Sequence, residues 1–227
     1  MESLSVVDAI RRRRSIKRFR PEPIPPPLLT TLIELTVQAP SSFNLQPWRI
    51  VVVQDAAQRQ LLRAAAFNQP QVTEAPVVLV FAVSLGGWRQ DLESVIAQGI
   101  ENGTWSERYG DYMRRAVPAF QDQLGRQQLL REYGIKDAVI AATHTALAAE
   151  SLGLGSCFMN GWIEAQVKAA IGAGDDPDIA IAVVLPIGYA ETIPANPGRL
   201  PMCCNVYADR IDQPFGGASD SKTTEPE

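Results

Sequence analysis

The stretch of this 227-residue chain with the clearest chemical character is a run of basic residues near its start. Seven of the ten residues from Arg11 to Arg20 are arginine or lysine, although the formal net charge of the whole chain is -4. Guanidinium groups form paired hydrogen bonds to phosphate oxygens, so such a run can hold a strongly anionic ligand. It can also be a solvated basic arm, which is the commoner explanation for an arginine run taken alone.

Three further segments carry side chains that suit the edge of a planar, polar heterocycle. The loop 39–48 combines serines, amides, prolines and a tryptophan, so it can offer hydrogen bonds while its backbone stays fixed. Asn68 and Gln71 stand between a helical pattern and an apolar one, and segment 153–162 has glycines near both ends that allow close approach of a ligand. Each segment also has an ordinary explanation as a turn or a helix stop.

Other common kinds of site have little support in the sequence. His144, the only histidine, lies between two threonines without an acidic partner, which favours a hydrogen-bonded core residue over a catalytic base. Cys157, Cys203 and Cys204 form no C-x-x-C pair, which argues against a disulfide framework and a structural zinc site. The glycines at 153–155 follow a helical pattern and lack the spacing of a dinucleotide fingerprint. No metal site is expected.

Hydrophobic periodicity predicts the elements that must position these segments. Helices are predicted over 4–10, 28–38, 56–66, 135–153 and 164–171, and strands over 49–53, 75–83 and 179–189. The helix over 135–153 is apolar around most of its circumference, so we expect it to be buried. Its alanines would also allow a second helix to approach closely, including one from another protomer. Residues 86–133 carry scattered aromatics and suit either a substrate lid or a subunit contact.

Composition narrows the class of protein. Hydrophobic residues make up 46% and charged residues 20%, which is ordinary for a globular chain and favours neither disorder nor a membrane protein. No apolar run reaches the roughly 18 residues of a spanning helix, and no export signal opens the chain, so a cytoplasmic location is expected. The acidic sequence pI of about 5.2 disfavours nucleic acid as a partner. Residues 216–227 are expected to form a disordered tail.

Taken together, the segments resemble the flavin-dependent nitroreductase family over nearly the whole chain, from Ala9 to about Tyr207. Any one of these segments alone would be weak support, but together their order and spacing resemble the family closely. The matching pieces are Arg13-Arg14-Ser15-Ile16-Lys17 with Phe19, Pro40-Ser41-Ser42 with Asn44-Leu45-Gln46-Pro47-Trp48, Asn68-Gln69 before Ala75-Pro76, the alanine-rich helix into Gly153-Leu154-Gly155, and Ile187-Gly188-Tyr189 followed by Arg199.

The resemblance implies an α+β fold with a central mixed β-sheet flanked by helices. It implies a single nitroreductase-like FMN-binding domain over residues 1–215. It also implies an intertwined homodimer with two FMN molecules at the subunit interface. By position, the phosphate and ribityl chain would be held by Arg13, Arg14, Ser15 and Lys17, and Arg199 would return to the phosphate from the tail.

The flavin ring, on the same resemblance, would be held by polar groups from both protomers. The residues from the other protomer would be Pro40, Ser41, Ser42 and Asn44. The pyrimidine edge would face Asn68 and Gln71. The residues near the flavin N5 would be Met159, Asn160 and Gly161.

The activity implied is electron transfer from NADH or NADPH through flavin N5 to a nitroaromatic, quinone or similar small acceptor, in a ping-pong cycle. No protein side chain has to act as nucleophile or metal ligand, because the cofactor carries the hydride. Two alternatives stay open. One is a flavoenzyme of the same fold with another redox reaction, such as dehalogenation or flavin fragmentation, and the other is a non-catalytic FMN carrier or redox sensor.

Two departures from the family pattern leave details open. Pro197 stands where relatives often have a second tail cation, and Gln71 stands where some have lysine. The sequence does not decide the physiological acceptor, the preference for NADH or NADPH, the role of residues 86–133, or whether Cys203 and Cys204 have a redox role.

Overall fold

A computed structural model describes residues 4–215, and the chain divides into two compact units between Pro194 and Ala195. The first unit contains all four strands of the described residues and every α-helix among them. The second contains Arg199 and one short 3₁₀ turn, η2 (Met202–Cys204). The tail over 216–227, for which disorder is expected, lies outside the described residues.

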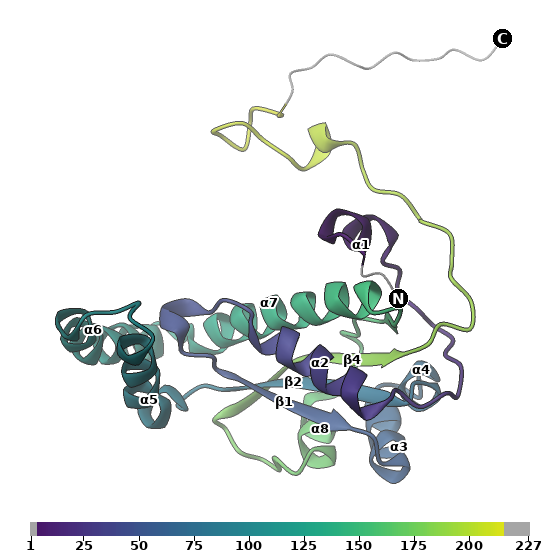
Figure 1. Cartoon of the computed structure of the whole chain (residues 1–227), viewed down its shortest axis with the longest axis horizontal. Coiled ribbons are helices and arrows are strands. Elements are labelled where there is room, and N and C mark those ends of the chain that lie inside the picture. The colour runs from purple at the N-terminus through teal and green to yellow at the C-terminus, as the bar shows by residue number, and fades with distance from the viewer. Residues whose placement is uncertain (1–3, 216–227) are drawn as a thin grey trace. The chain divides into compact units, whose positions relative to one another are not determined.

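Figure 1 labels all but η1 and β3 of the elements of the first unit, which follow in chain order. They are α1 (Val6–Arg12), α2 (Pro26–Val37), η1 (Ser42–Asn44), β1 (Trp48–Val53), α3 (Ala56–Ala65), α4 (Gln71–Glu74), β2 (Val77–Ser84), α5 (Trp88–Glu101), α6 (Glu107–Arg126), α7 (Leu130–Ser151), β3 (Gly155–Ser156), α8 (Glu164–Ala170) and β4 (Ile179–Gly188).

The strands form one sheet in the order β1-β2-β4-β3, and helices pack on it, which confirms the expected α+β class. All three pairs of neighbouring strands are antiparallel. The parallel component of the expected mixed sheet is a single isolated bridge between Ser15 and Ser156. That bridge lays the basic segment alongside β3.

The core has two layers because β2 is buried on both faces. Leu79 and Phe81 belong to the cluster shared with α2 and α7, whereas Val78 and Val80 belong to the cluster on the side of α3 and α8. Figure 1 shows these helix pairs on opposite faces of the sheet. A strand covered on both faces reads as a continuous apolar run, which is why the sequence predicted it directly.

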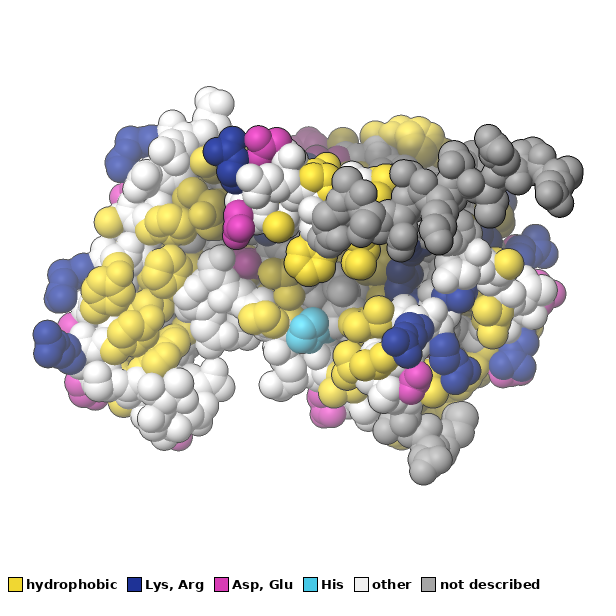
Figure 2. Space-filling model, turned by 90° about the horizontal axis from the view of Figure 1, so that it is seen from above, with side chains coloured by type: hydrophobic (Ala, Val, Ile, Leu, Met, Phe, Trp, Pro, Cys, Tyr) yellow, Lys and Arg dark blue, Asp and Glu magenta, His cyan; other side chains and the backbone are white. Residues whose placement is uncertain are grey.

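Helix α7 differs from the prediction in its start and in its outer face. It begins at Leu130, and its first turn carries exposed Arg131, so the apolar pattern starts only one turn later. Ile140 is 38% exposed and His144 only partly buried. Within one protomer the helix is therefore not buried all round, and His144 lies only partly buried on its outer face. Figure 2 shows the single cyan histidine among hydrophobic side chains on this face.

Residues 86–133 fold into α5, α6 and the first turn of α7. Helices α5 and α6 pack on each other around Ile96, Met113 and Val117, and Leu45 from the loop before β1 joins the same cluster. Within residues 4–215, no helix combines the length and apolar character that crossing a membrane requires.

Candidate functional site

The basic segment leaves α1 at Arg13 and runs alongside β3. The backbone N–H of Ile16 donates to the carbonyl oxygen of Ser156 at 3.0 Å. The contacts divide the side chains into two groups, since Arg13 and Lys17 meet residues 157–158 whereas Arg14 and Ile16 line a separate cavity. Alternation along extended backbone places Ser15 with the first group.

The first group contains cations whose partners are weak. The Arg13 guanidinium lies 6.0 Å from the centroid of the Phe158 ring, and Lys17 Nζ donates to Cys157 Sγ at 3.2 Å. A thiol is a poor acceptor, and neither cation forms an ion pair among residues 4–215. Both remain able to bind an anion.

The basic residues that follow are neutralised. Arg18 lies 3.4 Å from the Glu74 carboxylate, and Arg20 lies 3.2 Å from that of Glu22. The run is therefore not one uniform patch: its later cations are paired with acidic side chains, while Arg13 and Lys17 are not.

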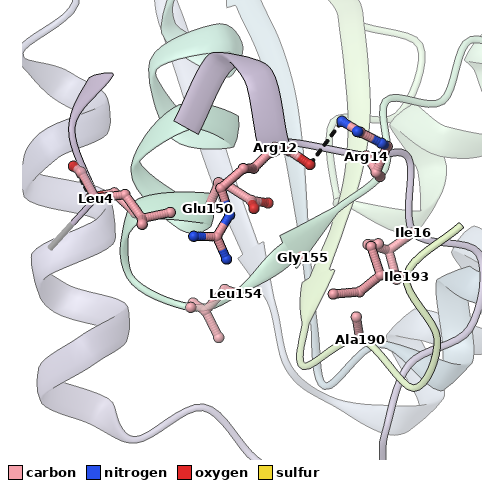
Figure 3. A pocket seen from close by; sticks show the side chains of 11 residues that line it. Leu4, Arg12, Arg14, Ile16, Glu150, Leu154, Gly155, Ala190 and Ile193 are labelled. Atoms are coloured by element: carbon pink, nitrogen blue, oxygen red, sulfur yellow. Dashed lines mark hydrogen bonds between the residues drawn. The ribbon is translucent and has the colours of Figure 1, made fainter. Parts of the chain in front are cut away.

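Arg14 faces away from the first group and closes the end of α1. Its Nη1 donates to the carbonyl oxygens of Arg11, Arg12 and Arg13 at 2.8, 2.9 and 2.9 Å. Carbonyls at a helix C-terminus lack partners within the helix and carry the negative end of its dipole, so a guanidinium stabilises them. Figure 3 shows Arg14 pointing back toward the carbonyl of Arg12.

Arg12, Arg14 and Glu150 line a cavity of about 280 Å³ between α1, the end of α7 and β3. Burial raises the pKa of Glu150, and the positive charges of Arg12, Arg14 and Arg13 oppose that shift. The Glu150 carboxyl therefore lies close enough to these three guanidinium groups for their charges to lower its pKa.

A chain of amide hydrogen bonds joins two of the predicted segments. The buried Gln71, 4% exposed, donates through Nε2 to Gln69 Oε1 at 3.0 Å, and Gln69 Nε2 donates to the Gly161 carbonyl oxygen at 3.1 Å. Asn68 is exposed and adopts a left-handed φ of 57°. Gln69 was not among the predicted site residues, and the only signal for it was its place beside Asn68.

Segment 155–161 connects all of these groups. The backbone of Met159 is fixed by two hydrogen bonds: its N–H donates to the Val184 carbonyl oxygen at 3.0 Å, and its own carbonyl accepts from Trp162 Nε1 at 3.0 Å. Asn160 follows as an exposed residue. The buried hydroxyl of Ser156 has no hydrogen-bond partner within residues 4–215. The segment therefore carries an unsatisfied polar group next to the residues that contact the two cations.

The loop carrying Pro40, Ser41, Ser42 and Asn44 is held elsewhere, at the beginning of α7. Ser42 donates to the Asp137 carboxylate through its N–H at 3.2 Å and through its hydroxyl at 3.3 Å. Asp137 is only 7% exposed. Burial raises the pKa of Asp137, and the hydrogen bonds from Ser42 partly offset that rise.

The backbone of this loop is strained and fixed. Phe43, Asn44 and Gln46 have φ values of 53°, 56° and 48°, a region that costs a non-glycine residue on the order of 1 kcal/mol. The Ser41 hydroxyl accepts a hydrogen bond from the Gln46 N–H at 2.9 Å. This bond and the Asp137 anchor hold a conformation that the residues would not adopt on their own.

One protomer does not bring this loop to the basic segment. Asp137, which anchors the loop, and Glu150, beside Arg12 and Arg14, lie 13 residues apart on α7, which corresponds to about 20 Å along the helix axis. Arg199 belongs to the second compact unit, where its Nη1 donates to the carbonyl oxygen of Gly198 at 2.6 Å.

Comparison with known proteins identifies related chains. Residues 10–189 match the family model described as the nitroreductase family. A protein named NADH dehydrogenase from Thermus thermophilus is 37% identical over 203 residues, which cover 88% of this chain and 95% of that protein.

Two solved structures share the fold at somewhat lower identity. One, from Exiguobacterium sibiricum, is described as a nitroreductase in complex with FMN; it is 25% identical, has a TM-score of 0.78, and the match covers 88% of this chain and 95% of that one. The other is the NADPH:FMN oxidoreductase of Vibrio harveyi complexed with NAD⁺, with 26% identity, a TM-score of 0.68, and coverage of 90% and 77%.

Proposed function

The chain belongs to the nitroreductase family, and on that basis we propose that it is an NAD(P)H-dependent oxidoreductase that binds FMN along segments 13–17 and 155–161. The observation that carries the proposal is the convergence on segment 155–161 of two cations without carboxylate partners and a chain of amides. FMN has the same two chemistries at its two ends, because its phosphate is dianionic and its ring edge is polar and uncharged.

The residues present fit this cofactor. Arg13 and Lys17 supply charge-assisted donors, which phosphate oxygens prefer, and their present partners are an aromatic ring and a thiol that a phosphate can displace. Ser15 lies between them, and the buried Ser156 hydroxyl alongside it still needs a partner. An unsatisfied buried hydroxyl is costly, so a ligand that reaches it would gain a hydrogen bond.

Within this proposal Arg14 has a supporting role in holding the phosphate. Its guanidinium fixes the last carbonyls of α1 and so sets the direction in which Arg13, Ser15 and Lys17 continue. Arg199 is proposed to reach the same phosphate, as the resemblance implies.

The amides are proposed to recognise the ring. The buried Gln71 donates a hydrogen bond to Gln69, which in turn donates to the Gly161 carbonyl oxygen. We propose that this pair sets the distance between the edge of the flavin ring and the backbone of residues 159–161. Asn68 remains exposed for a direct hydrogen bond. Asn160, also exposed, is the side chain of this segment that is free to face the ring.

When bound, FMN would supply the redox chemistry, which is hydride acceptance from NADH or NADPH and electron delivery to a nitroaromatic, quinone or similar acceptor. The part of the chain would be to bind and orient this cofactor. We propose that donor and acceptor bind in turn at one site beside the flavin, in a ping-pong cycle.

We propose that a second copy of the chain completes the site. The loop 40–44 lies about 20 Å along α7 from the end that carries Glu150, so another protomer has to supply it. The outer face of α7 is available for that contact, since Ile140 is exposed and Leu35 and Val37 of the adjacent α2 are exposed as well. A two-fold contact between such faces would bring each loop to the other chain's basic segment.

The residue test compares two cations of the same run. Arg13→Ala removes a proposed phosphate ligand and should weaken FMN binding by about 10-fold or more, because a hydrogen bond to a charged group contributes about 1.5–3 kcal/mol. Arg18→Ala removes a cation that is paired with Glu74 and should change FMN binding less than about threefold. FMN affinity is measured by fluorescence titration, with the melting temperature as a check on folding. Equal losses in the two variants would overturn the assignment of the phosphate to Arg13.

A further inference from the structure

The loop of residues 160–163 leaves the sheet at the outer edge of β4. Just before the loop, the Met159 N–H donates to the Val184 carbonyl oxygen at 3.0 Å, and β3 covers the same edge farther along the strand. Just after the loop, the chain enters α8. Over residues 179–183, this edge of β4 pairs with no strand among residues 4–215. N–H groups on such an edge need partners from elsewhere.

A bulge in β4 turns one more N–H group toward this edge. The register of β2 and β4 shifts between Phe81 and Ala82, and Ala182 is skipped. N–H groups alternate between the two edges of a regular strand, so those of Ile181 and Val184 would normally face opposite edges. The extra residue of the bulge brings both to the same edge. The Ile181 N–H therefore faces the edge on which the loop lies.

The side chain of Glu164 supplies the partner for this N–H. The Ile181 N–H donates to Glu164 Oε1 at 2.8 Å. The Arg131 guanidinium holds the same carboxylate with two bonds, from Nη1 to Oε1 at 2.8 Å and from Nη2 to Oε2 at 2.9 Å. Paired bonds of this kind fix the orientation of the carboxylate, which a single surface contact does not.

The ion pair joins two helices that pack on opposite faces of the sheet. Arg131 lies in the first turn of α7, and Glu164 is the first residue of α8 (Figure 1). Partial burial tends to raise the pKa of Glu164, but the hydrogen bonds from Arg131 and Ile181 lower it below its ordinary value of 4.5. The carboxylate is therefore ionised at neutral pH, and both of its oxygens accept hydrogen bonds.

The loop is held on its other side by residues at the end of α3 and just after it. The Ile163 N–H donates to the Ala65 carbonyl oxygen at 2.9 Å, and the Gly161 carbonyl accepts from Gln69 at 3.1 Å. Asn160 and Gly161 are exposed, so packing of their side chains contributes little. The position of the loop relative to the sheet therefore depends on the hydrogen bonds at its two ends.

We propose that Glu164, held by Arg131, is a positioning residue that fixes the loop 160–163 beside the flavin. The inference rests on the FMN site proposed above, in which Asn160 and Gly161 lie near the flavin N5. A misplacement of about 1 Å can slow a reaction by about 100-fold, because the reacting atoms must meet in one geometry. Loss of this contact should therefore slow flavin reduction more than it weakens FMN binding, since the phosphate is held by the basic segment.

Amide hydrogen exchange tests the contact before any FMN is added to the full chain. Glu164→Ala removes the acceptor and should speed exchange at Ile181 and in the loop by about 10-fold or more. Glu164→Gln keeps a side-chain oxygen for the N–H and should stay within about threefold of the parent chain. The control is Glu93→Ala, which removes a carboxylate that Arg114 also holds through both oxygens, at 3.1 Å each, and should leave exchange at these positions unchanged.

The same variants are then loaded with FMN and mixed with NADH or NADPH in a stopped-flow instrument. Glu164→Ala should reduce its flavin about 10-fold more slowly at saturating nicotinamide, with FMN affinity changed less than about threefold. Glu164→Gln and Glu93→Ala should reduce it at close to the parent rate. Arg131→Met keeps the acceptor but loses both bonds that orient it, so it should shift exchange and reduction in the same direction as Glu164→Ala, by less.

The outcomes separate this inference from the proposed function. Melting temperatures establish that each variant is folded. The positioning role alone is overturned if the parent flavin is reduced and Glu164→Ala reduces it as fast, or if Glu164→Gln is as slow as Glu164→Ala. Unchanged exchange in Glu164→Ala would show that the contact does not hold the loop, whatever the flavin does. A parent chain that binds no FMN overturns the proposed function and the positioning role together.

Discussion

The anchor between Asp137 and Ser42 can be tested by two substitutions with different chemistry. Asp137→Ala leaves the N–H and the hydroxyl of Ser42 without their acceptors at 3.2 and 3.3 Å. Asp137→Asn keeps an acceptor for the N–H, and its amide can donate to the hydroxyl. The two variants therefore separate the loss of the anchor from the loss of the charge.

The expected loss of stability on Asp137→Ala follows from the two hydrogen bonds and the buried carboxylate. Bonds to a charged partner contribute about 1.5–3 kcal/mol each, and removing a buried charge returns part of that. We expect Asp137→Ala to lower the free energy of unfolding by about 2 kcal/mol, or the melting temperature by about 4–8 °C for a chain of this size. Because the loop should then leave its strained conformation, FMN affinity should fall by about 10-fold in the same variant.

The stability that Asp137 contributes to the fold should decrease as the pH rises. Burial raises the pKa of Asp137, so the folded state holds the proton more tightly than the unfolded chain. The stability from this group is present below the ordinary pKa of 3.8 and is lost as the pH rises through the raised value. Asp137→Asn has no such loss, so its stability relative to the parent chain should grow over that interval and then stay constant.

Chemical denaturation across this pH range, together with FMN titration, measures all three effects. The reasoning is refuted if Asp137→Ala and Asp137→Asn lose FMN affinity equally, since the amide should preserve the anchor. It is also refuted if the parent chain gains stability relative to Asp137→Asn as the pH rises.

Two further predictions concern packing and assembly. Gly155→Ala would place a Cβ 2.5 Å from Ile16 Cγ1, so it should lower the free energy of unfolding by about 1–3 kcal/mol and weaken FMN binding by displacing the basic segment. Gly125→Ala is the control, because its Cβ would lie 3.6 Å from the nearest atom. Chemical denaturation and FMN titration should show its stability and affinity unchanged or improved. Ile140→Asp places a charge on the exposed face of α7 and should convert a dimer to a monomer with little retained FMN in analytical ultracentrifugation; a variant that stays dimeric would contradict the use of this face.

The sequence predicted well the strands that are buried on both faces. It predicted less well the elements whose residues differ in exposure or that are very short. The runs that became β2 and β4 were found because nearly all their side chains are buried. Strand β3, only two residues long, carries no periodic pattern, yet it aligns the basic segment. The partial exposure of His144 within one protomer was not predicted, because alanine-rich neighbours look apolar on every side, whereas burial of α7 depends on which of its faces meets the sheet.

The sequence predicted which types of residue form the candidate site, but not which of these residues lie together. The sequence indicated the cations, the amides and the glycines, yet it could not separate Arg13 from Arg14, because that difference arises from the end of α1 and the direction of an extended segment. Gln69 and Asp137 were not predicted as functional. Their partners lie 92 and 95 residues away in the chain, and a single sequence does not reveal such contacts.

Anaerobic stopped-flow measurement of the FMN-loaded protein tests the central claim most directly. The chain is mixed first with NADH or NADPH and then with a nitroaromatic or a quinone, while the absorbance of the flavin is followed. The account predicts that the nicotinamide bleaches the flavin in the absence of acceptor and that the acceptor restores the colour in a separate second mixing. A purified protein that retains no FMN, or whose bound FMN neither nicotinamide reduces, would contradict it.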